Sequence, residues 1–140
     1  MDSQTQELLS NNGKVNASEV KAPVILYYFS AHWCPPCRNF TPVLAELYKK
    51  WNANGKQIEI IFVTSDRDEK SFNEYFATMP WLAIPFGDPS IKVWKTKCEV
   101  SGIPTLAVIG TDGSVLTTDA RDIVSDKKED ALAAFKSLYN

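Results

Sequence analysis

The pattern of apolar and polar positions predicts two buried strands with a long helix between them. Residues 24–30 (VILYYFS) and 58–64 (IEIIFVT) are rich in β-branched and aromatic side chains and show little alternation, which is typical of strands covered on both faces. Between them, apolar residues recur at helical spacing, at Phe40, Val43, Leu44, Leu47, Tyr48 and Trp51. We expect Pro42 to kink this helix and Asn54-Gly55 to end it.

The middle of the chain predicts two further helices. Asp66 and Glu69 resemble a capping arrangement for a helix that Pro80 stops. The apolar face of this helix contains Phe72, Tyr75, Phe76 and Met79. Asp88-Pro89 supplies a cap and a first-turn proline for the next helix. The apolar positions of that helix include Ile91, Trp94 and Cys98.

The two ends of the chain carry a hairpin signal and a polar leader. Asp112-Gly113 lies between two β-prone segments, 105–109 and 115–118, and is a strong hairpin turn signal. A last helix is expected from about Asp126. Its inward positions are Leu132, Phe135 and Leu138. Residues 1–13 are interpreted as a flexible or weakly helical leader.

This order of elements predicts an α/β fold with parallel central strands and an antiparallel edge. The 140 residues suit one domain, 1–140, and a content of 44% hydrophobic residues is enough to build its core. No repeat or linker divides the chain.

Charge and hydropathy exclude several functions. With 15 basic and 17 acidic residues the net charge is −2, and the longest basic runs are the pairs Lys49-Lys50 and Lys127-Lys128. Binding to nucleic acid or to an anionic membrane is therefore not expected. Residues 1–21 are polar and contain no apolar core of a signal peptide, so we expect a reducing compartment, the cytoplasm or alternatively the nucleus.

The candidate chemistry lies in Cys34-Pro35-Pro36-Cys37, between the first predicted strand and the long helix. This position puts Cys34 near the helix N-cap, where the helix dipole and free amides are expected to lower the pKa of its thiol. Pro35 suits the first helical position because its missing backbone N–H costs nothing there. Pro36 also lacks a backbone N–H, so only the Cys37 amide remains to donate a hydrogen bond to the Cys34 sulfur. The pattern favours Cys34 as nucleophile and Cys37 as resolving thiol in disulfide exchange.

Several other residues admit both a structural and a functional interpretation. Three cysteines and one histidine, without a second CxxC, make a zinc site improbable. Trp33 either shields the dithiol, which we favour, or caps the core, and His32 is more simply a surface residue than a proton shuttle. Trp81 either borders a substrate groove or packs on a helix. Cys98 fits a small buried hydrophobe better than a regulatory thiol.

Four blocks follow one another along the chain, namely residues 28–38 (YFSAHWCPPCR), 62–67 (FVTSDR), 79–86 (MPWLAIPF) and 102–106 (GIPTL). They resemble the nucleoredoxin and tryparedoxin branch of the thioredoxin superfamily, and the resemblance covers about residues 8–125. It implies a thioredoxin fold, with a central mixed β-sheet flanked by helices on both faces.

The resemblance also implies site residues. Pro104 is then the cis-proline facing the CxxC, and Ile103 offers its backbone to an extended substrate. Arg121 matches an arginine that tryparedoxins use near their dithiol donor. The residues expected to contact substrate are Trp33, Pro35, Pro36, Ile103, Pro104 and Arg121. Two positions depart from relatives: Tyr28 replaces the buried aspartate of ordinary thioredoxins, and Ser65 replaces a tryptophan of tryparedoxins.

Together these features predict a protein-disulfide reductase that contributes to cell redox homeostasis without a metal or organic cofactor. The expected partners are disulfide-containing proteins, peroxidases among them, and an upstream reductase or a glutathione-like dithiol donor. A monomer is expected. Two alternatives remain open: a disulfide oxidase or isomerase, and a redox-regulated binding module without turnover.

Overall fold

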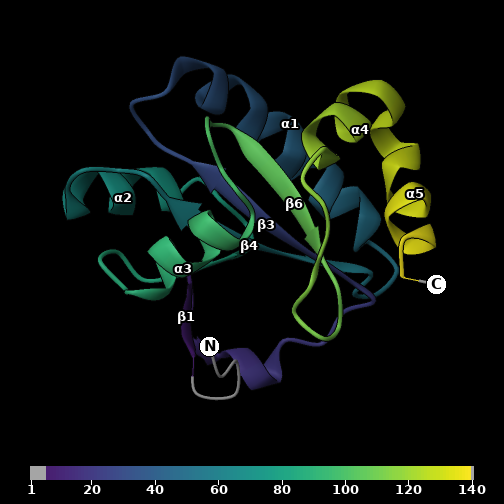
Figure 1. The fold of residues 1–140 in the computed structure, drawn as a ribbon, viewed down its shortest axis with the longest axis horizontal. Helices are drawn as coiled ribbons and strands as arrows, with labels where there is room; N and C mark the ends of the chain where they lie inside the picture. Colours follow the sequence, from purple (N-terminus) through teal and green to yellow (C-terminus); the bar gives the residue numbers. More distant parts are fainter. Residues whose placement is uncertain (1–5, 140) are drawn as a thin grey trace.

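The computed structural model describes residues 6–139, which form a seven-stranded mixed sheet with helices on both faces (Figure 1). The strand order is β2-β1-β5-β4-β3-β6-β7. The strands are β1 (Glu7–Ser10), β2 (Gly13–Asn16), β3 (Val24–Ser30), β4 (Ile58–Thr64), β5 (Leu82–Ala83), β6 (Thr105–Ile109) and β7 (Val115–Thr117). The helices are α1 (Pro35–Trp51), α2 (Glu69–Phe76), α3 (Ser90–Lys97), α4 (Ala120–Lys127) and α5 (Ala131–Ser137), with short 3-10 turns η2 (Ala17–Glu19) and η3 (Lys128–Asp130).

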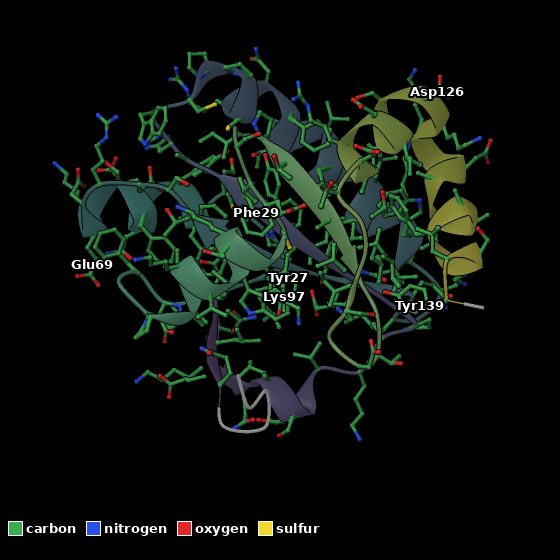
Figure 2. All side chains as sticks on the ribbon, viewed as in Figure 1. Tyr27, Phe29, Glu69, Lys97, Asp126 and Tyr139 are labelled. Atoms are coloured by element: carbon green, nitrogen blue, oxygen red, sulfur yellow. The ribbon has the colours of Figure 1, made fainter. Side chains whose placement is uncertain are left out.

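The centre of the sheet is the parallel pair β3 and β4, which run in register from Val24 opposite Ile58 to Ser30 opposite Thr64. Alternate residues of β3 point to opposite faces. Tyr28 joins a core cluster with α1, α2, α4 and α5, whereas Tyr27 and Phe29 pack with α3 on the other face (Figure 2). Because both faces are covered, the two strands lack polar alternation, as the sequence predicted.

The predicted hairpin is confirmed, with a difference in where it lies. β6 and β7 pair antiparallel around Asp112-Gly113, and Gly113 has a positive φ of 85°. β6 is an internal strand that pairs antiparallel with β3, so only β7 occupies this edge of the sheet. The antiparallel part of the sheet therefore reaches the strand that leads into the CxxC.

The N-terminal segment differs from the flexible or weakly helical leader expected for residues 1–13. Residues 7–16 form a β-hairpin, and β1 extends the sheet by pairing with β5 at Leu9 and Ala83. Asn11 in the hairpin turn donates its side-chain amide to the carbonyls of Phe76 (3.1 Å), the last residue of α2, and of Met79 (2.7 Å), just beyond it. Residues 1–5 lie outside the described part.

Several helix boundaries also differ from the sequence prediction. The carboxylate of Asp68 caps α2 by accepting a hydrogen bond from the Ser71 amide, whereas Asp66 is used elsewhere. α1 ends at Trp51, before Asn54-Gly55. The sequence predicted a single last helix from about Asp126, whereas α4 already begins at Ala120. Only Ala120 and Val124 of α4 are buried, so its apolar pattern is too weak to predict it from the sequence. No helix within residues 6–139 is long and apolar enough to cross a membrane.

The C-terminal segment is anchored by the buried apolar residues of α5 and by hydrogen bonds of Tyr139, just after it. Phe135 is fully buried as expected, but Leu138 is partly exposed and does not point inward. Tyr139, labelled in Figure 2, donates its hydroxyl to the Ile109 carbonyl at 2.6 Å and accepts from the Ile25 amide at 2.9 Å. The end of the chain is thereby tied to β3 and β6.

Phe62 on β4 is the aromatic centre of the core, and its truncation should be costly. It is fully buried and packs against Phe72 (5.8 Å between ring centroids) and Tyr75 (5.5 Å). We expect Phe62→Ala to lower the free energy of unfolding in urea by about 3–5 kcal/mol. Val93→Ala, at a half-exposed position on α3, is the control and should change it by less than about 0.5 kcal/mol. A loss below about 1 kcal/mol for Phe62→Ala would contradict this view of the core.

Candidate active site

Cys34 occupies the N-cap of α1, directly after the loop that leaves β3. Pro35 and Pro36 fill the first two helical positions, as predicted. The Cys34 side chain makes no hydrogen bond to a helix amide, which differs from the expected bond to the Cys37 amide. Instead its Sγ lies 3.8 Å from the carbonyl oxygen of Ile103, and the residue is 5% exposed.

Cys37 lies one turn further along α1 and is fully buried. Burial above all, together with the neighbouring Cys34, raises the pKa of its thiol to about 11, and interactions with the Ser30 hydroxyl and the Ala31 backbone oppose part of this rise. Cys37 is therefore a neutral thiol near neutral pH. The two sulfurs thus occupy different environments, one at the rim of the site and one beneath it.

The loop before β6 closes the site from the other side. The peptide bond between Ile103 and Pro104 is cis, in agreement with the position that the resemblance assigns to Pro104. Ile103 packs against a small buried cluster formed by Ala31, Cys34 and Cys37. Arg121, at the start of α4, donates from Nη1 to the Pro104 carbonyl at 3.4 Å, so it is held behind the cis-proline.

Trp33 and His32 attach the CxxC loop to the segments after β4. The Trp33 ring is 49% exposed, donates from Nε1 to the Ser65 carbonyl at 3.1 Å and lies 5.0 Å from the Arg67 guanidinium. The backbone amide of His32 donates to the Asp66 carboxylate at 2.8 Å. Asp66 therefore fixes this loop and does not cap α2.

Two other residues singled out from the sequence lie away from the dithiol. Trp81 is buried, with Tyr28 and Tyr48 packed edge-on against it, so it belongs to the core and does not border a groove. Cys98, the C-cap of α3, is buried in the same core cluster as Trp94, and burial raises the pKa of its thiol to about 11.

A groove of about 350 Å³ runs from the CxxC between α1 and α4. Pro36 and Arg121 face it from opposite sides, and Phe40, Val43 and Val124 supply apolar walls. The structure thus brings two of the expected substrate-contact residues to one groove. Trp33 lies on a different side of the site, against the segment after β4.

Beneath Cys37 lies a set of buried hydroxyl groups, most of which sequence reasoning did not find. The Tyr28 hydroxyl is 2.7 Å from that of Thr41, which donates to the Cys37 carbonyl at 3.0 Å. The Tyr75 hydroxyl is 2.6 Å from Thr41 and 2.7 Å from Ser30. Only Tyr28 was singled out from the sequence. Tyr75 comes from α2, 45 residues after Ser30, and no local pattern signals its approach.

Comparison with known proteins agrees with this architecture. Residues 23–115 match the family described as thioredoxin-like. The chain is 49% identical over 121 residues to probable nucleoredoxin 1 of Arabidopsis thaliana, which covers 86% of this chain but only 21% of that protein. It is 42% identical to tryparedoxin of Trypanosoma brucei brucei, covering 89% of this chain and 87% of that one.

A solved structure gives the same result in three dimensions. Tryparedoxin II complexed with glutathionylspermidine superposes with a TM-score of 0.82 at 35% identity, over 90% of this chain and 89% of that one. The agreement covers the fold as a whole, including the mixed sheet with helices on both faces. This chain therefore has the thioredoxin fold and belongs to the thioredoxin-like family, in the branch that contains the nucleoredoxins and tryparedoxins.

Proposed function

We propose that this chain is a protein-disulfide reductase in which Cys34 is the nucleophile and Cys37 the resolving thiol. The observation that carries the proposal is the asymmetry of the two sulfurs: Cys34 lies at a helix N-cap at the rim of the site, and Cys37 is a fully buried neutral thiol one turn below it. A helix N-terminus stabilises a thiolate, and burial opposes one.

The reaction then proceeds in two exchange steps. The Cys34 thiolate attacks one sulfur of the substrate disulfide and forms a mixed disulfide, while the other substrate sulfur leaves with the electron pair and is protonated by water. Cys37 gives its proton to solvent and attacks the Cys34 Sγ as a thiolate. The bond between Cys34 Sγ and the substrate breaks, and the second substrate sulfur leaves with the electron pair and takes up a proton from solvent. The products are a reduced substrate and a Cys34–Cys37 disulfide, and a dithiol donor returns two electrons to restore the starting state.

The substrate is proposed to lie across the cis-proline and along the groove beside it. The exposed residues Trp33, Pro35 and Pro36 surround the dithiol, and the backbone of Ile103 and Pro104 faces it. Arg121 adds a positive charge next to the Ile103-Pro104 backbone. A relative, tryparedoxin II, is described as complexed with glutathionylspermidine, which supports a glutathione-like dithiol as one candidate donor here.

Turnover and potential together test the proposal. We expect catalytic reduction of insulin disulfides with dithiothreitol as donor, and a Cys34–Cys37 reduction potential below about −220 mV from equilibration with glutathione. A potential near −180 mV or above would favour a disulfide oxidase or isomerase. One equivalent of exchange without turnover would favour a redox-regulated binding module, the second alternative from the sequence.

A further inference from the structure

We propose that Lys128 is a specificity-determining residue that binds an acidic side chain of a protein substrate at the far end of the groove between α1 and α4. The inference rests on the proposed function and deepens it, because it names the kind of substrate segment that the groove takes. That segment has an acidic residue about four positions from the cysteine that Cys34 attacks, with apolar side chains between the two.

The groove runs away from the dithiol along one face of each helix. Its lining residues include Pro36, Phe40 and Val43 of α1, and Arg121, Val124 and Lys128 of α4 and its C-cap. In both sets the residues are three or four positions apart, the spacing of neighbours on one helix face. Figure 1 shows α4 beside α1, with the groove between them.

Contacts at each end of α4 fix the direction of the groove. At the dithiol end, Arg121 donates to the Pro104 carbonyl at 3.4 Å. At the other end, the carbonyl of Glu129 accepts from Nε1 of Trp51, the last residue of α1, at 2.9 Å. The two helices therefore lead away from the dithiol in the same direction. With a rise of 1.5 Å per residue, Lys128 lies about 10 Å beyond Arg121 along α4.

The charge of the groove is positive at both ends. Among the described residues that line it, Arg121 and Lys128 carry positive charges and none carries a negative one. Neither cation forms a salt bridge within residues 6–139. Asp122 and Asp126, the latter labelled in Figure 2, lie on α4 but do not line the groove. Between the two cations the walls are apolar, and Val43 is 52% exposed. The groove is therefore complementary to apolar side chains followed by an acidic one.

The backbone of Lys128 provides a second, independent observation. Its φ of 51° and ψ of −121° are the angles of the first central residue of a type II′ turn, a position where glycine is the usual residue. Glycine would make this turn without the steric cost that a Cβ atom imposes. Strained non-glycine residues are typical of binding sites. Here the strained residue carries the charge at the far end of the groove.

The length of the groove sets the position of the acidic residue. Nine residues separate Cys34 from Val43 on α1, which corresponds to about 13 Å along the helix. An extended peptide rises about 3.3 Å per residue, so about four substrate residues cover this length. Their apolar side chains would contact Phe40 and Val124, and the carboxylate would reach Lys128.

Peptides that differ in one residue test the proposal. Each contains a single cysteine in a mixed disulfide with 2-nitro-5-thiobenzoate, and either Glu or Gln four positions away, with apolar residues between. Cys34 of the reduced full chain, in excess, attacks the peptide sulfur and displaces the coloured thiolate, which is the better leaving group because its thiol has the lower pKa. We expect the Glu peptide to react at least threefold faster than the Gln peptide at low salt, and less selectively at 0.5 M salt.

The peptide pair is made with the variable position before the cysteine and again after it. The preference for Glu is expected in one of the two placements, because the groove leads away from the dithiol in a single direction.

Variants of the two neighbouring lysines separate a local contact from general attraction. Lys128→Ala and Lys128→Gly should reduce the Glu-to-Gln rate ratio to less than half of the wild-type ratio, and Lys128→Glu should favour the Gln peptide. Lys127→Ala is the matched control, because it removes an adjacent charge that does not line the groove, and it should keep more than half of the ratio.

Stability distinguishes the two neutral variants of Lys128. Both remove the charge, but only glycine relieves the positive φ. We therefore expect Lys128→Gly to unfold at a higher urea concentration than Lys128→Ala while it loses the same selectivity.

Three results would overturn the proposal: a wild-type ratio below threefold in both placements, an equal loss of the ratio in Lys127→Ala and Lys128→Ala, or a urea midpoint of Lys128→Gly no higher than that of Lys128→Ala. The proposed function fails in a different way. If wild type displaces no coloured thiolate from any of the peptides, Cys34 is not the nucleophile, whatever the lysine variants do.

Discussion

The Cys34→Ser chain is expected to lose disulfide reduction altogether. Serine at the N-cap keeps the position and the helix contacts, but its hydroxyl does not ionise near neutral pH and cannot attack a disulfide. Cys37 cannot take over, because it is fully buried and its pKa is raised to about 11. A buried thiol with a raised pKa is a poor nucleophile at pH 7, so the residual rate should lie far below the wild-type rate. Insulin reduction with dithiothreitol as donor, corrected for the donor alone, measures this loss.

Cys98→Ser is the matched control for that loss. It replaces the third cysteine by the same residue, but Cys98 lies at the C-cap of α3, within the core cluster on the other face of the sheet from Tyr28. Cys98→Ser should therefore retain turnover within about twofold of wild type. Residual activity of a few per cent in Cys34→Ser would contradict the assigned nucleophile, and so would a complete loss in Cys98→Ser with the fold intact.

The Cys37→Ser chain should behave differently and accumulate a covalent intermediate. Cys34 keeps its position at the N-cap and still attacks the substrate, but no second thiol is available one turn below to release it. We expect one equivalent of substrate to remain bound to Cys34, visible as an added mass by intact mass spectrometry and removed by dithiothreitol. Multiple turnover should fall to the rate at which the external thiol resolves the adduct.

The double variant Cys34→Ser/Cys37→Ser identifies the attached sulfur, because it should form no adduct under the same conditions. Peptide mapping of the Cys37→Ser adduct should place the bond on Cys34 and leave Cys98 free. Release of substrate by Cys37→Ser as fast as by wild type would show that the roles of the two cysteines are wrongly assigned.

The parts of the fold that could be predicted are those in which the residue types depend on local burial and local backbone structure alone. The apolar runs 24–30 and 58–64 match β3 and β4 in full, because both faces of these strands are covered and every side chain must be apolar or paired. The N-cap position of Cys34 could also be predicted from local features, namely the end of a strand, two prolines and the start of an apolar stripe.

The parts that could not be predicted depend on partners distant in the sequence. Tyr75 carries the apolar pattern of α2, yet its hydroxyl reaches Ser30, and nothing near position 75 signals this. Asp66 resembled a helix cap but bonds the His32 amide. The Cys34 side chain, free to rotate at the N-cap, turns toward the Ile103 carbonyl on the segment before β6. In each case the arrangement depends on a contact with a residue distant in the sequence.

The N-terminal hairpin has a consequence for where the domain can be cut. The thioredoxin-like match begins at residue 23, but β1 covers the edge of β5, and Asn11 satisfies two carbonyls at the end of the helix that carries Tyr75. A shortened chain starting at residue 23 would leave the β5 edge open as a template for another copy. Residues 7–16 thus cover β5 and move the open edge of the sheet to the four-residue strand β2, a cover that the matched segment alone does not include.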